Sequence, residues 1–205
     1  LGVSPRYNSH PLPGQSLSLS EAKERGQGDG RKGFLINLIG VHLLTRIIER
    51  AYNAPVVGRE ETLEKRLGIS FADSGLLSLA LTHPSAVNEA PQAFSSSNQR
   101  LEFLGDAFID FVVAQELYRR LPQMSEGELT ELRSSIVRGE TLARVARDLS
   151  LGSFIHMGQG EEGSGGRERE SNLAATLEAV VGAMLLDRGS EAAYNLTLEL
   201  LKLEL

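Results

Sequence analysis

Apolar residues recur at every third or fourth position through most of the chain after about residue 59, which is the spacing of one helix face. The longest such stretch runs from 98 to about 121 and predicts a central helix. Its apolar positions are Leu101, Leu104, Phe108, Phe111, Val112 and Leu117. Three further helices are predicted to begin near Arg59, after the capping residue Asp73 and at Glu140. Three others are predicted over residues 125–138, 172–187 and 190–205.

Sequence signals also mark where these helices begin and stop. Ser125 and Glu128 have the spacing of a capping box, and Pro84 should end the helix that precedes it. Residues 88–98 are polar and predict a loop. Residues 158–166 are rich in glycine and charge. The loop 158–169 lacks the Gly-Lys-Ser/Thr ending of a phosphate-binding loop, so we interpret it as a flexible connector.

The composition favours an all-α protein with one folded domain. Only 5% of the 205 residues are aromatic and none is Trp, while Leu, Ala, Glu and Arg are frequent. We expect residues 59–205 to form this domain and residues 1–58 to be an extension of uncertain structure. Within the extension, 1–33 favour disorder and 34–52 show a loose helical pattern. No stretch reaches the roughly 20 apolar residues that span a bilayer, so we expect no membrane association.

Charge and cysteine content narrow the chemistry of any site. The chain has no Cys, which excludes disulfides and thiolate metal sites and agrees with a reducing compartment. We expect a cytoplasmic protein, with an organelle as the alternative. The formal net charge of -6 argues against binding nucleic acid through overall charge alone, and it suits a cation site built from oxygen ligands.

Acidic residues form a stripe on the predicted central helix. Gln99, Glu102, Asp106 and Asp110 follow one another at spacings of three and four residues, which places them along one face. The sequence around Glu102 and Asp106 is apolar, so these carboxylates should lie at the edge of buried surface, where they need a partner or a cation. We interpret Asp110 as an ordinary solvated residue.

A further carboxylate, Glu178, lies within the mostly apolar helix predicted over 172–187. If this helix crosses the central one, Glu102, Asp106 and Glu178 would converge into an oxygen-rich site of the kind that Mg²⁺ and Mn²⁺ prefer. Such a site suits phosphodiester hydrolysis. The alternative is that these carboxylates are solvated or paired with a base such as Arg100.

Residues 99–106 read Q-R-L-E-F-L-G-D and resemble the ribonuclease III signature E-R-L-E-F-L-G-D at seven of eight positions. The resemblance continues in order through 80–83, 128–133, 140–143 and 160–171. It implies the all-α nuclease fold of that family and a homodimer that cuts double-stranded RNA with Mg²⁺, or Mn²⁺ as substitute, in ribosomal or messenger RNA maturation. The similar region includes no counterpart of the double-stranded-RNA-binding domain common in bacterial members, so we expect weak, salt-sensitive RNA binding.

The resemblance also assigns roles to residues. It implies metal ligation by Glu102, Asp106 and Glu178, with catalytic roles for Asp106 and Glu178. Phe103 matches an aromatic residue that enters a pocket of the partner subunit, although ordinary core packing is the alternative. The plausible RNA phosphate contacts are arginines, which can equally be solubilising residues: Arg133, Arg138, Arg167 and Arg169.

Two positions depart from the family pattern. Ala175 stands where the family carries an acid three residues before the essential glutamate, and Gln99 replaces the usual glutamate. The first departure would leave the cation one ligand short. The alternative to an active nuclease is therefore a catalytically impaired relative that acts as an RNA-binding or ribosomal scaffold.

Overall fold

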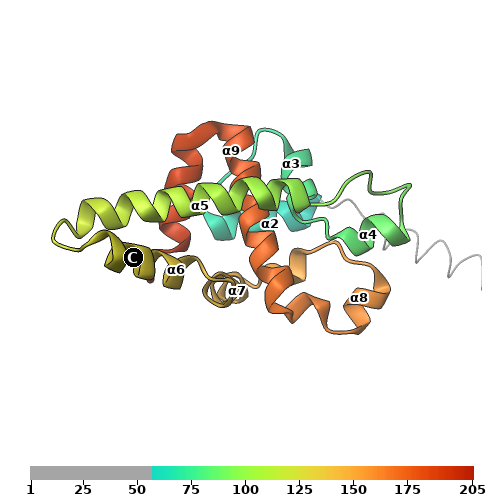
Figure 1. Cartoon of the computed structure of the whole chain (residues 1–205). Coiled ribbons are helices and arrows are strands. Elements are labelled where there is room, and N and C mark those ends of the chain that lie inside the picture. Colours follow the sequence, from blue (N-terminus) through green and yellow to red (C-terminus); the bar gives the residue numbers. More distant parts are fainter. Residues whose placement is uncertain (1–56) are drawn as a thin grey trace, which may run out of the picture. The chain divides into compact units, whose positions relative to one another are not determined.

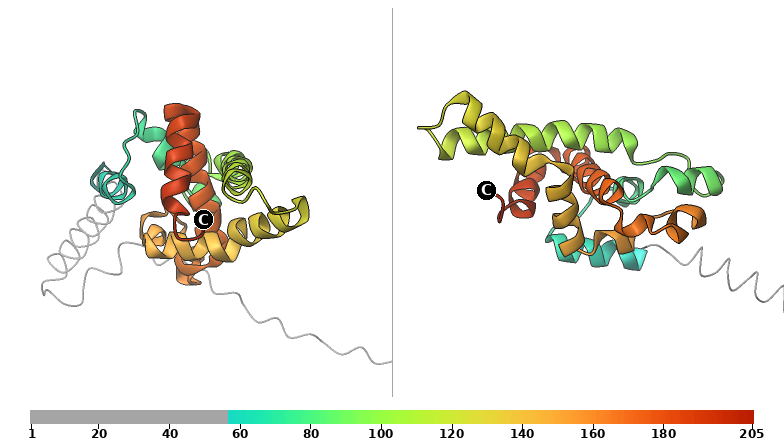
Figure 2. Two further views of the ribbon diagram at one scale, coloured as in Figure 1. Left: turned by 90° about the vertical axis from the view of Figure 1, so that its left-hand side faces the viewer. Right: turned by 60° about the horizontal axis from the view of Figure 1, so that its bottom comes forward.

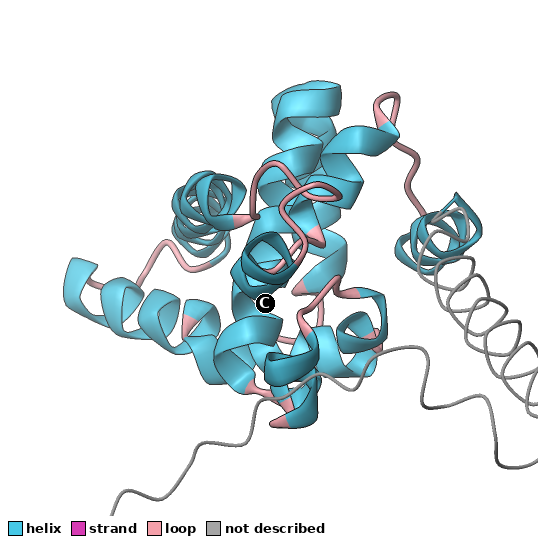
Figure 3. Cartoon of the chain, turned by 90° about the vertical axis from the view of Figure 1, so that its right-hand side faces the viewer, coloured by secondary structure: helices cyan, strands magenta, loops and turns pink. Residues whose placement is uncertain are grey.

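The computed structural model describes residues 57–205, with side chains from Thr62 onward, and every regular element in that range is a helix (Figures 1 and 3). The expected all-α fold is confirmed there, while the expectations for residues 1–56 lie outside the described range. The helices are α2 (Val57–Leu67), α3 (Ser74–Ala80), α4 (Pro84–Glu89), α5 (Gln99–Arg120), α6 (Glu126–Val137), α7 (Gly139–Asp148), α8 (Gln159–Gly163) and α9 (Glu170–Leu200), with 3₁₀ turns η2 (Leu151–Phe154) and η3 (Gly166–Glu168).

The core is built around α9, which packs on α3, α5 and α7. Leu173, Ala174, Ala179 and Val180 of α9 are buried, and at about 100° per residue they lie on more than one side of the helix. A helix that is apolar on several sides is stable only in the interior, which explains its central place. Gly189 interrupts α9 with φ of 81°, so its two parts lie at an angle to each other (Figures 1 and 2).

Most helix boundaries agree with the sequence signals. The capping box is present, since Ser125 accepts from the Glu128 N–H while the Glu128 carboxylate accepts from the Ser125 N–H. Asp73 caps α3 by accepting from the Gly75 N–H. The first described helix begins at Val57, two residues earlier than expected, and α9 ends at Leu200 rather than at the last residue. None of the described helices combines the length and apolar character that a bilayer crossing requires.

The segment expected to be a flexible connector, 158–169, instead contains α8 and η3. Glu89, at the end of α4, accepts hydrogen bonds from the Gln159 and Gly160 N–H groups and so holds the start of α8. Arg167 donates to two backbone carbonyls of the preceding segment. The start of the connector is therefore ordered by Glu89, a residue distant in the chain that local composition does not reveal.

Candidate active site

Helices α5 and α9 approach until their backbones touch, and two glycines make this contact sterically feasible. A Cβ atom on Gly105 would lie 1.8 Å from the Glu178 carbonyl oxygen, and one on Gly182 would lie 2.2 Å from the Leu101 carbonyl oxygen. Any side chain at either glycine would force the helices apart. Because the contact includes Glu178 itself, the crossing brings that residue beside the acidic stripe of α5.

The electrostatics of Glu178 show which carboxylates come together. Burial is the largest cause that raises the pKa of Glu178 to about 7, followed by the charges of Asp106, Glu102 and Asp110. Burial and then the charge of Asp106 raise the pKa of Glu102. No Lys or Arg contributes to either pKa, so pairing with Arg100 does not account for these carboxylates. The structure thus gathers the acids that the spacing had placed on two helices.

The donor set suits a hard divalent cation, because all the candidate ligands are carboxylates. Among residues with described side chains, no three acidic or imidazole groups lie close enough to enclose an ion directly. Side-chain rotation would have to draw Glu102, Asp106 and Glu178 together around it. Asp110 adds an observation in favour of the fit, since its Oδ1 atom is buried without a hydrogen-bond partner in the described region.

Ala175 lies one turn before Glu178 on α9 and is half-buried. The polar neighbours on the same turn are occupied elsewhere: the Thr176 hydroxyl donates to the Asn172 carbonyl, and the Asn172 amide donates to Glu161 and to a backbone carbonyl. Neither side chain therefore supplies the acid that the resemblance implies for position 175.

Phe103 is not a core residue, because 78% of it is exposed. It begins an apolar stripe along the outside of α5 that also contains Phe111 and Tyr118, which are 58% and 74% exposed. Ala107 and Ala114 lie between them at helical spacing. Phe111 shares its helical spacing with buried residues of α5 such as Leu101 and Val112, yet it lies on the exposed side of the helix.

The four candidate arginines differ in how their guanidinium groups are used. Arg167 is held by Glu162 and by two carbonyls, so its contacts are structural. Arg169 pairs with Glu161 and donates to Ser164. Arg138 lies 3.6 Å from Glu140 and donates to Thr141, at the junction of α6 and α7. Arg133 is half-buried beside a depression of about 350 Å³ between α5 and α6.

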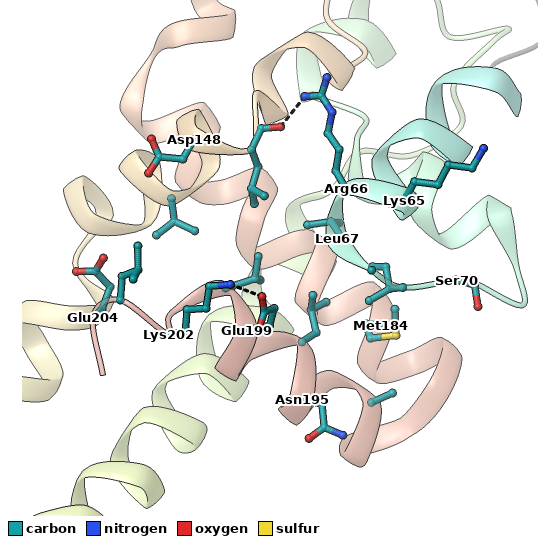
Figure 4. A pocket seen from close by; sticks show the side chains of 18 of the residues that line it. Lys65, Arg66, Leu67, Ser70, Asp148, Met184, Asn195, Glu199, Lys202 and Glu204 are labelled. Atoms are coloured by element: carbon teal, nitrogen blue, oxygen red, sulfur yellow. Dashed lines mark hydrogen bonds and ion pairs between the residues drawn. The ribbon is translucent and has the colours of Figure 1, made fainter.

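A second and larger groove, of about 960 Å³, opens between the end of α2, α7 and the last part of α9 (Figure 4). Arg66 spans one side of it and donates to the Leu149 carbonyl, while Lys202 pairs with Glu199 on the other side. None of the carboxylates at the α5–α9 crossing lines this groove. It is therefore separate from the candidate active site.

The raised pKa of Glu178 predicts a pH dependence of stability. Between the ordinary pKa of a glutamate and about 7, Glu178 binds more protons in the folded chain than in the unfolded one, so its contribution to the free energy of unfolding falls as pH rises. In Glu178→Gln, we expect the free energy of unfolding to decrease over this pH range by about 1 kcal/mol less than in the parent, a value discounted for the partial exposure of Glu178. Urea unfolding with chelator at several pH values measures it, and parallel curves for the two proteins would contradict it.

The helical fold and the carboxylates at its central crossing define a class of nuclease domain. A family model described as Ribonuclease-III-like matches residues 73–204, and the chain belongs to this family. The chain is 52% identical to ribonuclease 3 of Pelotomaculum thermopropionicum over 139 residues, which are 68% of this chain and 58% of that protein. It is 47% identical to ribonuclease 3 of Heliobacterium modesticaldum over 153 residues, covering 75% and 63%.

Solved structures agree with this assignment. The nuclease domain of ribonuclease III from Campylobacter jejuni superposes with a TM-score of 0.65 at 41% identity, covering 70% of this chain and 96% of that one. That structure concerns flexibility in a region involved in dimer formation of the nuclease domain. The chain spans only 58% and 63% of the length of the two relatives above. Family and fold are therefore established for the matched region.

Proposed function

We propose that this chain is a metal-dependent endoribonuclease that hydrolyses phosphodiester bonds in double-stranded RNA. The observation that carries the proposal is the crossing of α5 and α9, which brings Glu178 beside the helix that carries Glu102 and Asp106. The pKa values of Glu102 and Glu178 are raised, and no basic residue contributes to either. Its direct test is cleavage of a labelled RNA duplex by the full chain with Mg²⁺ and then with Mn²⁺. The family membership supports the same substrate class.

The carboxylates have distinct places in this proposal. Glu102, Asp106 and Glu178 would hold the cation, which when bound supplies a water of lowered pKa and neutralises charge on the phosphate. Asp106 is exposed and so lies where a phosphate can approach from solvent. Glu178 is half-buried and holds its proton up to a pH of about 7, so it must release this proton before it can bind a cation.

RNA binding would rest on local rather than overall charge, because the net charge is -6. Of the four arginines, Arg133 is the strongest candidate for a phosphate contact, since the other three are engaged in ion pairs and hydrogen bonds of the fold. We therefore expect weak binding that is sensitive to salt. Maturation of ribosomal or messenger RNA in the cytoplasm, or in an organelle, is the role that we propose for such an enzyme.

We also propose that the chain acts as a homodimer through the apolar stripe of α5. Three exposed aromatic side chains on one helix face exceed what a monomer surface normally leaves in water. The stripe lies on the same helix as Glu102 and Asp106, so a partner docked there would lie close to the site. The dimer-forming nuclease domain from Campylobacter jejuni supports this arrangement.

Phe111→Glu should therefore convert dimer to monomer, because a charge would replace the aromatic ring at the centre of the stripe. We expect the dissociation constant of the dimer to rise by about 100-fold. Light scattering coupled to gel filtration over a range of concentrations measures this. Leu186→Glu is the matched control, since Leu186 on α9 is 59% exposed and lies outside the stripe. Equal behaviour of both variants would show that the stripe is not the interface.

A second candidate function is a scaffold that keeps the fold but has lost catalysis. Ala175 favours it, because the position contributes no acid and its polar neighbours Asn172 and Thr176 are occupied. The scaffold hypothesis expects a folded dimer that binds RNA and cleaves none with either cation. The cleavage assay separates the two functions.

A further inference from the structure

Asp110 on α5 carries a buried carboxylate oxygen with no partner. Its Oδ1 atom is shielded from solvent, and within the described part of the chain it accepts no hydrogen bond. A buried acceptor without a partner is costly, and buried carboxylates are normally paired or bound to a cation. The shielding of Oδ1 corrects the interpretation of Asp110 as an ordinary solvated residue.

The environment of Asp110 is the candidate active site. It follows Asp106 by one helical turn, and its charge acts on the carboxyl of Glu178, which is on the other helix. The charges of three acids of α5 raise the pKa of Glu178, and Asp110 is the one of the three that lies farthest along that helix. The oxygen without a partner therefore belongs to the group of carboxylates rather than to an unrelated part of the core.

The sense of the helix crossing places Asp110 toward Ala175. Leu101 of α5 contacts Gly182 of α9, whereas Gly105 of α5 contacts Glu178, so later residues of α5 meet earlier residues of α9. One further step of four residues leads to Ile109 on α5 and Ala174 on α9, which are both buried. Asp110 and Ala175 each follow these residues by one position. The acid that α9 lacks can thus be supplied from the facing helix.

We propose that Asp110 provides the cation with the carboxylate that Ala175 cannot provide. This inference rests on the proposed function, since it concerns the same cation. It gives the site four acids, three from α5 and one from α9, and it makes the alanine compatible with a working centre. Asp110 is then a ligand, or a positioning residue that holds a water bound to the cation.

The test is Mn²⁺ binding by the full chain without RNA, measured by calorimetry or by the paramagnetic resonance signal of free Mn²⁺. We expect Asp110→Asn to weaken binding about tenfold, the order found when groups around a metal are removed. The matched control is Asp148→Asn, the same substitution at an exposed residue of α7. Glu178→Gln is measured alongside, because it reports on the proposed site independently of Asp110.

Thermal unfolding gives a second readout that does not depend on catalysis. Without cations, Asp110→Asn should melt at the same or a higher temperature than the parent, since the amide removes a buried charge that has no partner. With saturating Mn²⁺, the parent should gain more thermal stability than the variant. A substitution that merely damaged the fold would lower both melting temperatures.

The double variant Asp110→Asn with Ala175→Asp decides whether one acid stands in for the other. We expect the new acid on α9 to restore Mn²⁺ affinity to within about threefold of the parent, because the number of carboxylates is restored. If Asp110→Asn binds like the parent while Glu178→Gln binds weakly, the inference about Asp110 is wrong and the proposed function stands. If neither substitution alters binding, the cation site itself is wrong, and the inference falls with it.

Discussion

Glu178→Gln should reduce cleavage of double-stranded RNA by about 10³-fold, the size of effect produced when a group that stabilises transition-state charge is removed. Glu178 is the acid from α9 at the crossing, so no neighbour on its own helix can replace it. Gln keeps the size and much of the packing of Glu, while it cannot carry the negative charge that a cation requires. The fold and the dimer should therefore persist while catalysis is lost.

The measurement is a single-turnover cleavage assay on a labelled, perfectly paired duplex with Mg²⁺ and with Mn²⁺. Glu191→Gln is the matched control, because Glu191 is an exposed glutamate of the same helix beyond its kink. RNA affinity measured in chelator should be nearly equal for all three proteins. A parent chain that is folded and dimeric but cuts nothing with either cation would favour the scaffold, and an unimpaired Glu178→Gln would remove Glu178 from the catalytic site.

The acidic stripe could be predicted from sequence because its information is local. Spacings of three and four residues place Glu102 and Asp106 on one helix face whatever the tertiary structure is. That Glu178 joins them depends on where α9 crosses, which periodicity does not specify. The signal was present in Gly105 and Gly182, but a glycine inside a helix is usually only a weak point, so its meaning emerges once both backbones are seen in contact.

The exposed apolar stripe of α5 and the ordered connector are two features that could not be predicted from local sequence. Phe111 has the same helical spacing as buried residues of α5, because core faces and interface faces follow one period. The segment 158–166 has the composition of a loop, yet Glu89 of α4 holds its start from 70 residues earlier in the chain. Both outcomes depend on partners distant in sequence, so a pattern taken along one segment could not reveal them.

Gly105→Ala should destabilise the protein by about 3 kcal/mol or more, which lies at the upper end for overpacking. The added Cβ would lie 1.8 Å from the Glu178 carbonyl oxygen and 3.0 Å from the Gly182 nitrogen, and both are backbone atoms that cannot rotate away. Relief requires the two helices to separate. Separation would also move Glu178 away from Glu102 and Asp106, so stability and cation binding should be lost together.

Gly127→Ala is the matched control, since Gly127 lies in α6 and a Cβ there meets no atom within 4 Å. It should raise the free energy of unfolding by about 0.5 kcal/mol, because alanine restricts the unfolded chain more than glycine does. Urea unfolding measures both variants. If Gly105→Ala were as stable as the parent, the backbones would not touch at this point, and the crossing could no longer explain how carboxylates on two helices form one site.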